Sequence, residues 1–328
     1  EHTLVFTDTG SLTGAWEFNS QVSSGDQLKA VNGVEVNNSR DVRDVIVGNF
    51  VPGESVTLTI DFADGTTRDQ VITLQQFPDD GVSVYVILPT LISFIFLALS
   101  IWTFGLRRNE PAGRAFTMFA SSFSIVTGTI FNLWTSHELS LIWTFACAMA
   151  GGSTIALAVS FPSAPRILVE RPYLRWIGFL VSFVLTGLAA PYIFNMEAPT
   201  EYIGLWRNIY YFDALAILFL LATNFYYAVY SPSPVSKSQA RSTLFGALVA
   251  FVPLTIFLSL GQVLNINFSP LMFLPVVIFP AVMGYNIMRF RFLRTDDLAR
   301  RGVMYTALSI IVSSGYALVA AGAGLMFG

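Results

Sequence analysis

One acidic residue, Asp213, lies inside a long apolar segment of the chain, in the stretch RNIYYFDALAI. A carboxylate within a membrane span is energetically costly, so such a residue is a candidate functional group by default. Two interpretations stay open. Either Asp213 contributes to function, or it lies only about 8 Å from the outer start of its helix, at 1.5 Å per residue, and reaches interfacial water.

Aromatic residues accompany this carboxylate in the sequence. Trp206, Tyr210 and Tyr211 precede it closely, and Trp134 and Trp143 flank a short polar loop. An aromatic belt at the level of the lipid headgroups would explain them without a ligand. Alternatively, they form the walls of a site for a hydrophobic or lipidated molecule that enters between the outer ends of the spans. The candidate ligand-binding residues are therefore Asp213, Trp206, Tyr210, Tyr211, Trp134 and Trp143.

The residues needed for hydrolytic or metal chemistry are missing from the sequence. The chain has two histidines, His2 and His137, and Leu141 stands where a second zinc-binding histidine would follow His137. His137 has no evident orienting partner for serine chemistry. Cys147 is the single cysteine, so one chain cannot form a disulfide or a thiolate metal site, and we interpret it as a core residue. We expect no catalytic residue, no metal and no cofactor.

Eight apolar stretches are long enough to be membrane spans, because a hydrocarbon core about 30 Å thick needs about 20 residues of helix. Cytoplasmic loops collect Lys and Arg. The loops after the first, third, fifth and seventh stretches carry thirteen basic residues, and the other loops carry only Arg207. This predicts a multi-pass protein of the cell membrane with residues 1–80 on the extracytoplasmic side. The predicted spans are 83–106, 115–134, 139–161, 174–195, 208–230, 242–263, 271–288 and 303–327.

The last of these spans would run back to the outer face. A cytoplasmic output domain would therefore need a further helix after Gly328, and export of the front part of the chain would need a helix upstream of Glu1. Residues 1–80 carry four basic and thirteen acidic residues, a net charge of −9, whereas residues 81–328 carry fourteen basic and eight acidic residues, a net charge of +6. An acidic front part would repel phosphate, so nucleic-acid binding is disfavoured.

The sequence between residues 27 and 74 predicts strand, turn, strand, helix, strand, turn, strand. Asn32-Gly33 supplies the two positive-φ positions of a tight hairpin turn. Asn38 or Ser39 would cap the helix that follows. The segment SVTLTIDF then alternates apolar and polar residues before a turn at ADG, as expected for a strand with one buried face.

The stretch GDQLKAVNGVEVNNSRDVRDVI, a spacer at Gly53 and VTLTI together resemble the second half of bacterial PDZ domains, over roughly residues 20–75. In that family a peptide strand adds to a sheet edge beside a helix, with its carboxylate held by backbone N–H groups of a glycine-containing loop. The segment EHTLVFTDTGSLTGAWEFNSQVSS departs from the pattern, since it has no clear carboxylate loop. The resemblance implies a PDZ-like domain at residues 1–80, with either peptide binding or a structural or dimerising role.

Residues 285–308, YNIMRFRFLRTDDLARRGVMYTAL, form a basic segment beside the last predicted span. Arginines there would bind anionic headgroups, and the paired aspartates would suit a helix start. The segment also resembles a signature of bacterial multispan sensors, which precedes the last helices and a cytoplasmic output domain. The resemblance implies a signal-transmitting hinge at Arg289, Arg291, Arg294, Asp296, Asp297, Arg300 and Arg301.

The expected fold is thus an α-helical polytopic membrane bundle with eight spans, residues 81–328, preceded by a small α+β PDZ-like domain. This layout is similar to the input half of quorum-sensing histidine kinases of the ComP type. The similarity implies a homodimeric sensor in the lipid bilayer that detects an extracellular signal such as a hydrophobic or lipidated peptide. It also implies a cytoplasmic kinase, absent from this chain, that acts on a response regulator. The alternatives are a scaffold that holds another envelope protein and a transporter.

Overall fold

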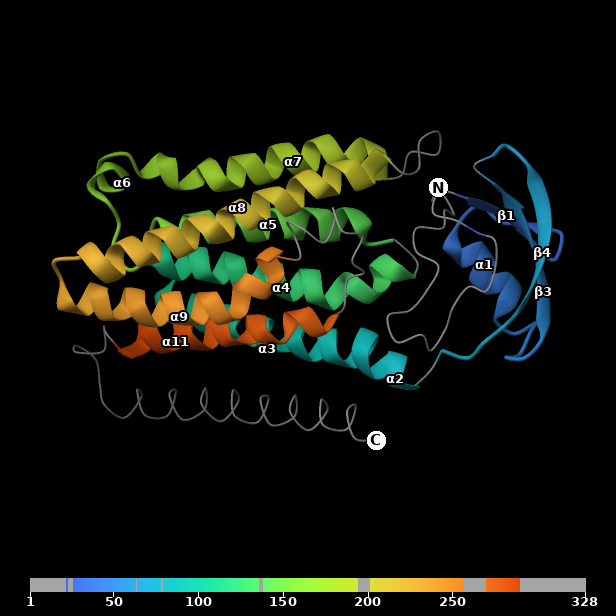
Figure 1. The fold of residues 1–328 in the computed structure, drawn as a ribbon, viewed down its shortest axis with the longest axis horizontal. Coiled ribbons are helices and arrows are strands. Elements are labelled where there is room, and N and C mark those ends of the chain that lie inside the picture. The colour runs from blue at the N-terminus through green and yellow to red at the C-terminus, as the bar shows by residue number, and fades with distance from the viewer. Residues whose placement is uncertain are drawn as a thin grey trace.

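The chain folds into a bundle of helices with a small β-sheet at one end (Figure 1). The structure is a computed structural model, and it describes residues 22, 26–62, 64–77, 79–135, 138–193, 201–256 and 270–289. Buried apolar side chains fall into two separate clusters, one under the sheet and one inside the bundle. We refer to residues 26–77 as the sheet region and to the helices that follow as the bundle.

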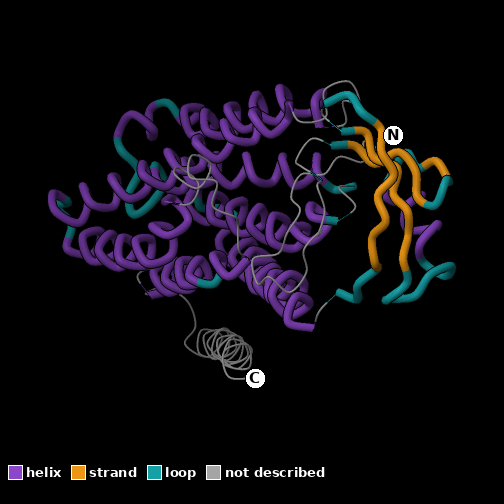
Figure 2. Tube along the Cα trace, turned by 45° about the vertical axis from the view of Figure 1, so that its right-hand side comes forward, coloured by secondary structure: helices purple, strands orange, loops and turns teal. Residues whose placement is uncertain are grey.

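The sheet region has the order of elements that the sequence predicts for residues 27–74. Its strands form one antiparallel sheet in the order β2-β1-β3-β4, and α1 joins β2 to β3. Figure 2 shows the four strands side by side at the end of the bundle. The elements are β1 (Gln27–Val31), β2 (Val34–Glu35), α1 (Ser39–Ile46), β3 (Ser55–Asp61) and β4 (Thr67–Thr73).

Local chemistry explains the turn and the cap of this region. Asn32 and Gly33 have φ values of 49° and 77°, as a primed hairpin turn requires. Of the two predicted helix caps, Asn38 and Ser39, the structure has Asn38, whose side-chain oxygen accepts hydrogen bonds from the backbone N–H groups of Arg40 and Asp41 at 2.9 and 3.0 Å. The apolar face of β3 and the inner face of α1 meet in a core that contains Val31, Val36, Val56, Leu58, Ile60, Val42, Val45 and Ile46.

The bundle begins where α2 (Asp79–Val82) and one π-helical turn (Ser83–Ile87) lead into α3. Short helical segments lie between the long helices at Arg166–Glu170 (α6), Pro172–Trp176, Pro270–Phe273 and Pro275–Val277. The longer helices are α3 (Leu88–Arg107), α4 (Pro111–Trp134), α5 (Ser140–Ala158), α7 (Ile177–Ile193), α8 (Glu201–Tyr230), α9 (Pro234–Ile256) and α11 (Ile278–Arg289).

Within the described residues, six helices are long and apolar enough to cross a membrane, which is typical of a multi-pass membrane protein. They correspond to the first six predicted spans and are Ser83–Arg107, Pro111–Leu133, Ser140–Ala158, Pro172–Ile193, Glu201–Tyr230 and Pro234–Ile256. The prediction of eight spans is not confirmed. The seventh is a shorter apolar segment, Pro270–Asn286, because prolines at Pro270 and Pro275 start tight helical turns in place of a continuous α-helix. The eighth, 303–327, lies outside the described residues.

The two ends of the bundle differ in charge. The sheet region lies at one end, and the turn between α8 and α9 and the segment around α6 lie at the other (Figure 1). Alternate turns of an up-and-down bundle share an end, so the basic residues of the odd-numbered loops gather opposite the sheet region. In the described loops these residues are Arg107, Arg108, Arg114, Arg166, Arg171, Arg175, Lys237 and Arg241.

Helix α5 is the most enclosed helix of the bundle, with α4, α7 and α8 packed around it. Its close contact with α7 depends on a pair of glycines. A Cβ atom on Gly152 would lie 2.8 Å from the carbonyl oxygen of Gly178. Small residues allow such close approach, and in a membrane this packing replaces the hydrophobic effect as a source of helix association.

Candidate functional site

The candidate site lies between α5 and α8. On α8, Tyr202, Trp206 and Tyr210 follow one another at four-residue intervals, and Asp213 comes three residues later. Residues three and four apart lie on one face of a helix. This face of α8 therefore presents three aromatic rings and then a carboxyl group along the helix.

Asp213 is buried, with 8% of its surface exposed. Because α8 begins at Glu201, twelve residues earlier, the carboxyl lies about 18 Å along the helix axis, at 1.5 Å per residue, rather than about 8 Å. The interpretation of Asp213 as a residue near the helix start therefore does not fit the structure. The helix is longer than the predicted span because the segment EYIGLWR continues it toward the amino terminus.

Among the described residues, one side chain donates a hydrogen bond to the carboxyl of Asp213. The thiol of Cys147 on α5 donates to Oδ2, with Sγ and Oδ2 3.3 Å apart. Oδ1 is buried against the backbone of Gly151 and has no side-chain donor among the described residues. The ion pairs among the described residues do not include Asp213, so no lysine, arginine or histidine in that part of the chain neutralises it.

Gly151 brings α5 and α8 together at this point. A Cβ atom there would run into Oδ1 of Asp213, and it would lie 2.7 Å from Cε1 of the Phe212 ring. Any larger residue would push α8 away. The contact between Asp213 and α5 therefore depends on a glycine one helical turn beyond Cys147.

Four aromatic side chains between the start of α8 and Asp213 pack together, and we call Trp143, Tyr202, Trp206 and Tyr210 the aromatic cluster. The ring centroid of Trp206 lies 5.0 Å from that of Trp143 and 4.8 Å from that of Tyr202. Tyr210 lies 6.2 Å from Trp143 in an edge-on arrangement. The indole N–H of Trp206 donates to the hydroxyl of Thr144 at 2.9 Å, whereas the buried Nε1 of Trp143 donates no hydrogen bond.

The structure brings four of the six predicted ligand-binding residues together: Asp213, Trp206, Tyr210 and Trp143. Tyr211 is 37% exposed and does not belong to the aromatic cluster, because it stands one residue away from Tyr210 on the helix. Trp134 is the last residue of α4, and its side chain lies outside the described part of the structure.

Sequence reasoning missed the roles of Tyr202, Thr144, Cys147 and Gly151. The four-residue spacing with Trp206 and Tyr210 could have identified Tyr202. The other three lie on α5, and no signal in the sequence pairs α5 with α8. Cys147 is buried as expected, but it is also the hydrogen-bond partner of Asp213.

A second polar cluster joins α9 to α11 and has no unsatisfied atoms among its side chains. Ser242 donates to Oδ1 of Asn286 at 2.7 Å, and Nδ2 of Asn286 donates to Thr243 at 2.9 Å. Asn286 thus bonds across helices. Asn224, also buried in the bundle, instead donates to the Leu220 carbonyl of its own helix at 2.9 Å.

Most of the predicted hinge lies outside the described residues. Arg289 is the last residue of α11, and nothing is described of its side chain. The expectations for Arg291, Arg294, Asp296, Asp297, Arg300 and Arg301 stay predictions.

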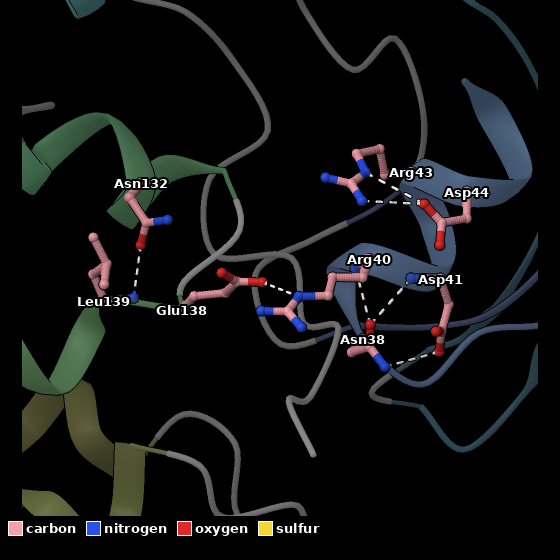
Figure 3. Close-up of polar contacts among 8 residues, drawn as sticks. All are labelled: Asn38, Arg40, Asp41, Arg43, Asp44, Asn132, Glu138 and Leu139. Atoms are coloured by element: carbon pink, nitrogen blue, oxygen red, sulfur yellow. Dashed lines mark hydrogen bonds and ion pairs between the residues drawn. The ribbon is translucent and has the colours of Figure 1, made fainter. Parts of the chain in front are cut away.

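An ion pair connects the sheet region to the start of α5. Nε of Arg40, in the first turn of α1, lies 2.6 Å from Oε1 of Glu138 (Figure 3). This hydrogen bond to Glu138 raises the pKa of Arg40 above its ordinary value. The backbone N–H of Leu139 donates to Asn132 at 2.8 Å, which fixes the turn in which Glu138 lies. The sheet region thus contacts the turn from which α5 begins.

Among the described residues, no group of three or more His, Cys, Asp or Glu side chains is placed to hold a metal ion. The α5–α8 site therefore consists of one carboxyl group, one thiol and four aromatic rings in the interior of a membrane-type bundle. Comparison with protein-family models, with curated proteins and with solved structures found no match to this chain.

Proposed function

We propose that this chain is the input module of a membrane receptor. In this proposal a signal is received at the end of the bundle that carries the sheet region, and α5 carries it to the basic end. The observation that supports this receptor proposal is the position of α5. This helix begins beside Glu138, which pairs with the sheet region, and it holds Cys147, which pairs with Asp213.

The charge distribution supports an orientation for the receptor. The loops opposite the sheet region are rich in Arg and Lys, and such loops face the cytoplasm. The sheet region would then lie on the extracytoplasmic side of the cell membrane. The order of its elements and its hairpin turn at Asn32-Gly33 support a PDZ-like domain that rests on the receptor and orders its outer end.

The polar contacts of α5 supply an element that could have two arrangements. Burying a carboxyl group with a single weak donor is costly, and the cost falls when a better partner arrives. A ligand shifts a protein between two arrangements only as far as it interacts differently with each. Oδ1 of Asp213, which is buried without a side-chain donor among the described residues, offers such a difference. The output, following the resemblance to sensor kinases, would be a cytoplasmic histidine kinase that acts on a response regulator.

The test is whether a substitution in the contact between the sheet region and α5 changes a distance measured at the basic end of the bundle. Spin labels at Arg108→Cys and Ser238→Cys, both at exposed positions of the basic end, report the distance between the α3–α4 and α8–α9 turns. The chain is reconstituted in nanodiscs. The native Cys147 is buried, and the chain without added cysteines shows whether it takes up label.

We expect Glu138→Arg to alter the distance distribution, because it replaces an attraction to Arg40 by a repulsion. The double variant Arg40→Glu/Glu138→Arg restores the opposite charges and should restore the original distribution. Glu35→Arg, which changes an exposed charge of the sheet region on β2, is the matched control and should leave it unchanged. Identical distributions in all four proteins would contradict a receptor and favour a scaffold.

A further inference from the structure

We infer that the α5–α8 site binds a ligand that carries a positively charged amino or ammonium group on an apolar body. This inference names the class of ligand that the proposed receptor would bind. It rests on the proposed function only for the consequence of binding, not for binding itself. It starts from Asp213, whose surface is 8% exposed and whose Oδ1 has no side-chain donor among the described residues. Buried carboxylates are paired or hydrogen-bonded in proteins, and no cation among the described residues provides the pairing.

The aromatic cluster suits the same class of ligand. The faces of aromatic rings carry partial negative charge, and Trp binds cations best among the three aromatic residue types. Two tryptophans and two tyrosines form a chain of rings with neighbouring centroids 4.8–6.2 Å apart. Tyr210, at one end of this chain, stands one helical turn before Asp213. Several rings together with one carboxylate are the composition of sites that recognise ammonium groups.

A second buried polar atom at the site also lacks a partner. Trp143 is 5% exposed, and its Nε1 donates no hydrogen bond, although a buried indole N–H normally has an acceptor. Trp143 stands one helical turn before Cys147 on the same face of α5. Two buried polar groups of the site, the Trp143 N–H and Oδ1 of Asp213, are therefore left without a side-chain partner by the described residues.

The site becomes more accessible toward the amino-terminal end of α8. Asp213 and Trp143 are buried, whereas Tyr202, Trp206 and Tyr210 are half-buried. The rings thus extend from the accessible part of the bundle to the carboxyl. A ligand with an apolar body can follow them from the lipid interface while its charged group reaches Asp213.

An organic cation fits this site better than a metal ion does. Calcium takes six to eight oxygen ligands and magnesium six, whereas the described residues bring no group of three or more His, Cys, Asp or Glu side chains together here. Rings and a single carboxylate instead match a large, weakly hydrated cation.

The test measures binding of tritiated benzyltrimethylammonium to the chain in phosphatidylcholine nanodiscs by scintillation proximity. The lipid is zwitterionic, so its headgroups carry no net charge that would collect the cation. Competition with unlabelled benzyltrimethylammonium and with neopentylbenzene compares the same shape with and without the positive charge.

We expect saturable binding that the charged compound displaces and the neutral one does not. Asp213→Asn should weaken it by about thirtyfold or more, as loss of a buried charge partner does. Glu201→Gln removes an exposed acidic charge from the first turn of the same helix and should leave binding unchanged.

Trp206→Leu and Trp206→Phe keep the inference testable should Asp213→Asn fail to fold. Both substitutions remove the hydrogen bond to Thr144, but only Phe keeps a ring, so Leu should weaken binding more than Phe. Equal displacement by neopentylbenzene, or equal affinity in Asp213→Asn, would overturn the inference. Specific binding without any change in the distances between Arg108→Cys and Ser238→Cys would keep the inference and overturn the receptor proposal.

Discussion

In the sheet region threonine hydroxyls pair with aspartates at the surface, whereas in the bundle they donate to carbonyls of their own helix. The hydroxyl of Thr59 on β3 donates to Oδ1 of Asp69 on β4 at 2.7 Å, at an exposed position. Within the bundle, Thr127 donates to the carbonyl of Phe123 at 2.8 Å, and Thr154 to that of Ala150 at 2.7 Å. Water can complete the hydrogen bonds of the first group, but lipid cannot, so these threonines of the bundle use the carbonyls of their own helix.

The two cores are also built from different residues. β-Branched side chains on alternate positions fill the core of the sheet region, as in Val56 and Ile60. Phenylalanines on different helices fill the core of the bundle. The ring centroid of Phe119 lies 5.4 Å from that of Phe279 and 6.0 Å from that of Phe251. The comparison shows that burial of apolar surface stabilises the core of the sheet region, whereas close fit and internal hydrogen bonds stabilise the core of the bundle.

The largest effect is expected for Ile60→Ala, which tests whether the sheet region relies on apolar burial. Ile60 is fully buried, and removing its side chain should destabilise the sheet region by about 2–5 kcal/mol. Hydrogen exchange of the whole chain in nanodiscs should show faster exchange in β1, β3 and β4 with the bundle unaffected. Val71→Ala, at an exposed position of the same sheet, should change little. Equal effects of the two variants would contradict this account of the core.

The next effect tests close fit in the bundle. Gly152→Ala would force a Cβ to within 2.8 Å of the Gly178 carbonyl oxygen, so α5 and α7 must separate, at a cost of about 1–3 kcal/mol. Thermal unfolding in detergent measures the loss. Gly187→Ala on α7 is the matched control, because nothing lies within 4 Å of its added Cβ, and it should keep or slightly raise stability. A loss in Gly187→Ala as large as in Gly152→Ala would show that glycine packing is not the cause.

A smaller effect tests internal hydrogen bonding. Asn286→Ala removes two bonds between α9 and α11 and should cost about 1 kcal/mol, since side-chain hydrogen bonds within membranes average about 0.6 kcal/mol each. Asn224→Ala removes a single bond within α8 and should cost less. Unfolding of the two variants by a denaturing detergent gives the comparison. The reverse order of stability would mean that the α9–α11 contacts do not depend on this cluster.

The smallest effect belongs to the surface of the sheet region. The hydroxyl and backbone N–H of Thr66 donate to Asp64 and lower the pKa of that carboxyl. A lowered pKa means that the interaction contributes stability above the ordinary pKa of an aspartate, and that this contribution is lost as the pH falls through the lowered value. Thr66→Ala removes the larger of the two causes and should raise the pKa of Asp64 toward its ordinary value, as an NMR titration of the carboxyl would show. An unchanged titration would assign the shift to the backbone alone.

Local sequence chemistry predicted the sheet region well. The Asn32-Gly33 turn and the Asn38 cap depend on neighbouring residues, and the structure confirms both. The alternation of Val56, Leu58 and Ile60 likewise places these residues in the core. In the bundle, apolar length predicted six helices, but not the start of α8 at Glu201, because the polar segment before residue 208 carries no hydropathy signal.

The candidate site could be predicted only in part. The cost of an intramembrane carboxylate pointed to Asp213, and proximity in sequence pointed to Trp206 and Tyr210. The contribution of Cys147 and Gly151 depends on which helices are neighbours. That choice comes from the fit between small residues on α5, α7 and α8, and a single sequence does not reveal it.

The position of α5 between α4, α7 and α8 also bears on the order in which the protein is assembled. Two of these three neighbours, α7 and α8, follow α5 in the chain, so they leave the ribosome later. Until α8 has been made, the face of α5 that carries Gly151 lacks its partner helix, although small residues gain most from close contact with another helix. Biosynthesis of the bundle is therefore complete around α5 only when α8 arrives, and the closing contact is the one between Gly151 and Asp213.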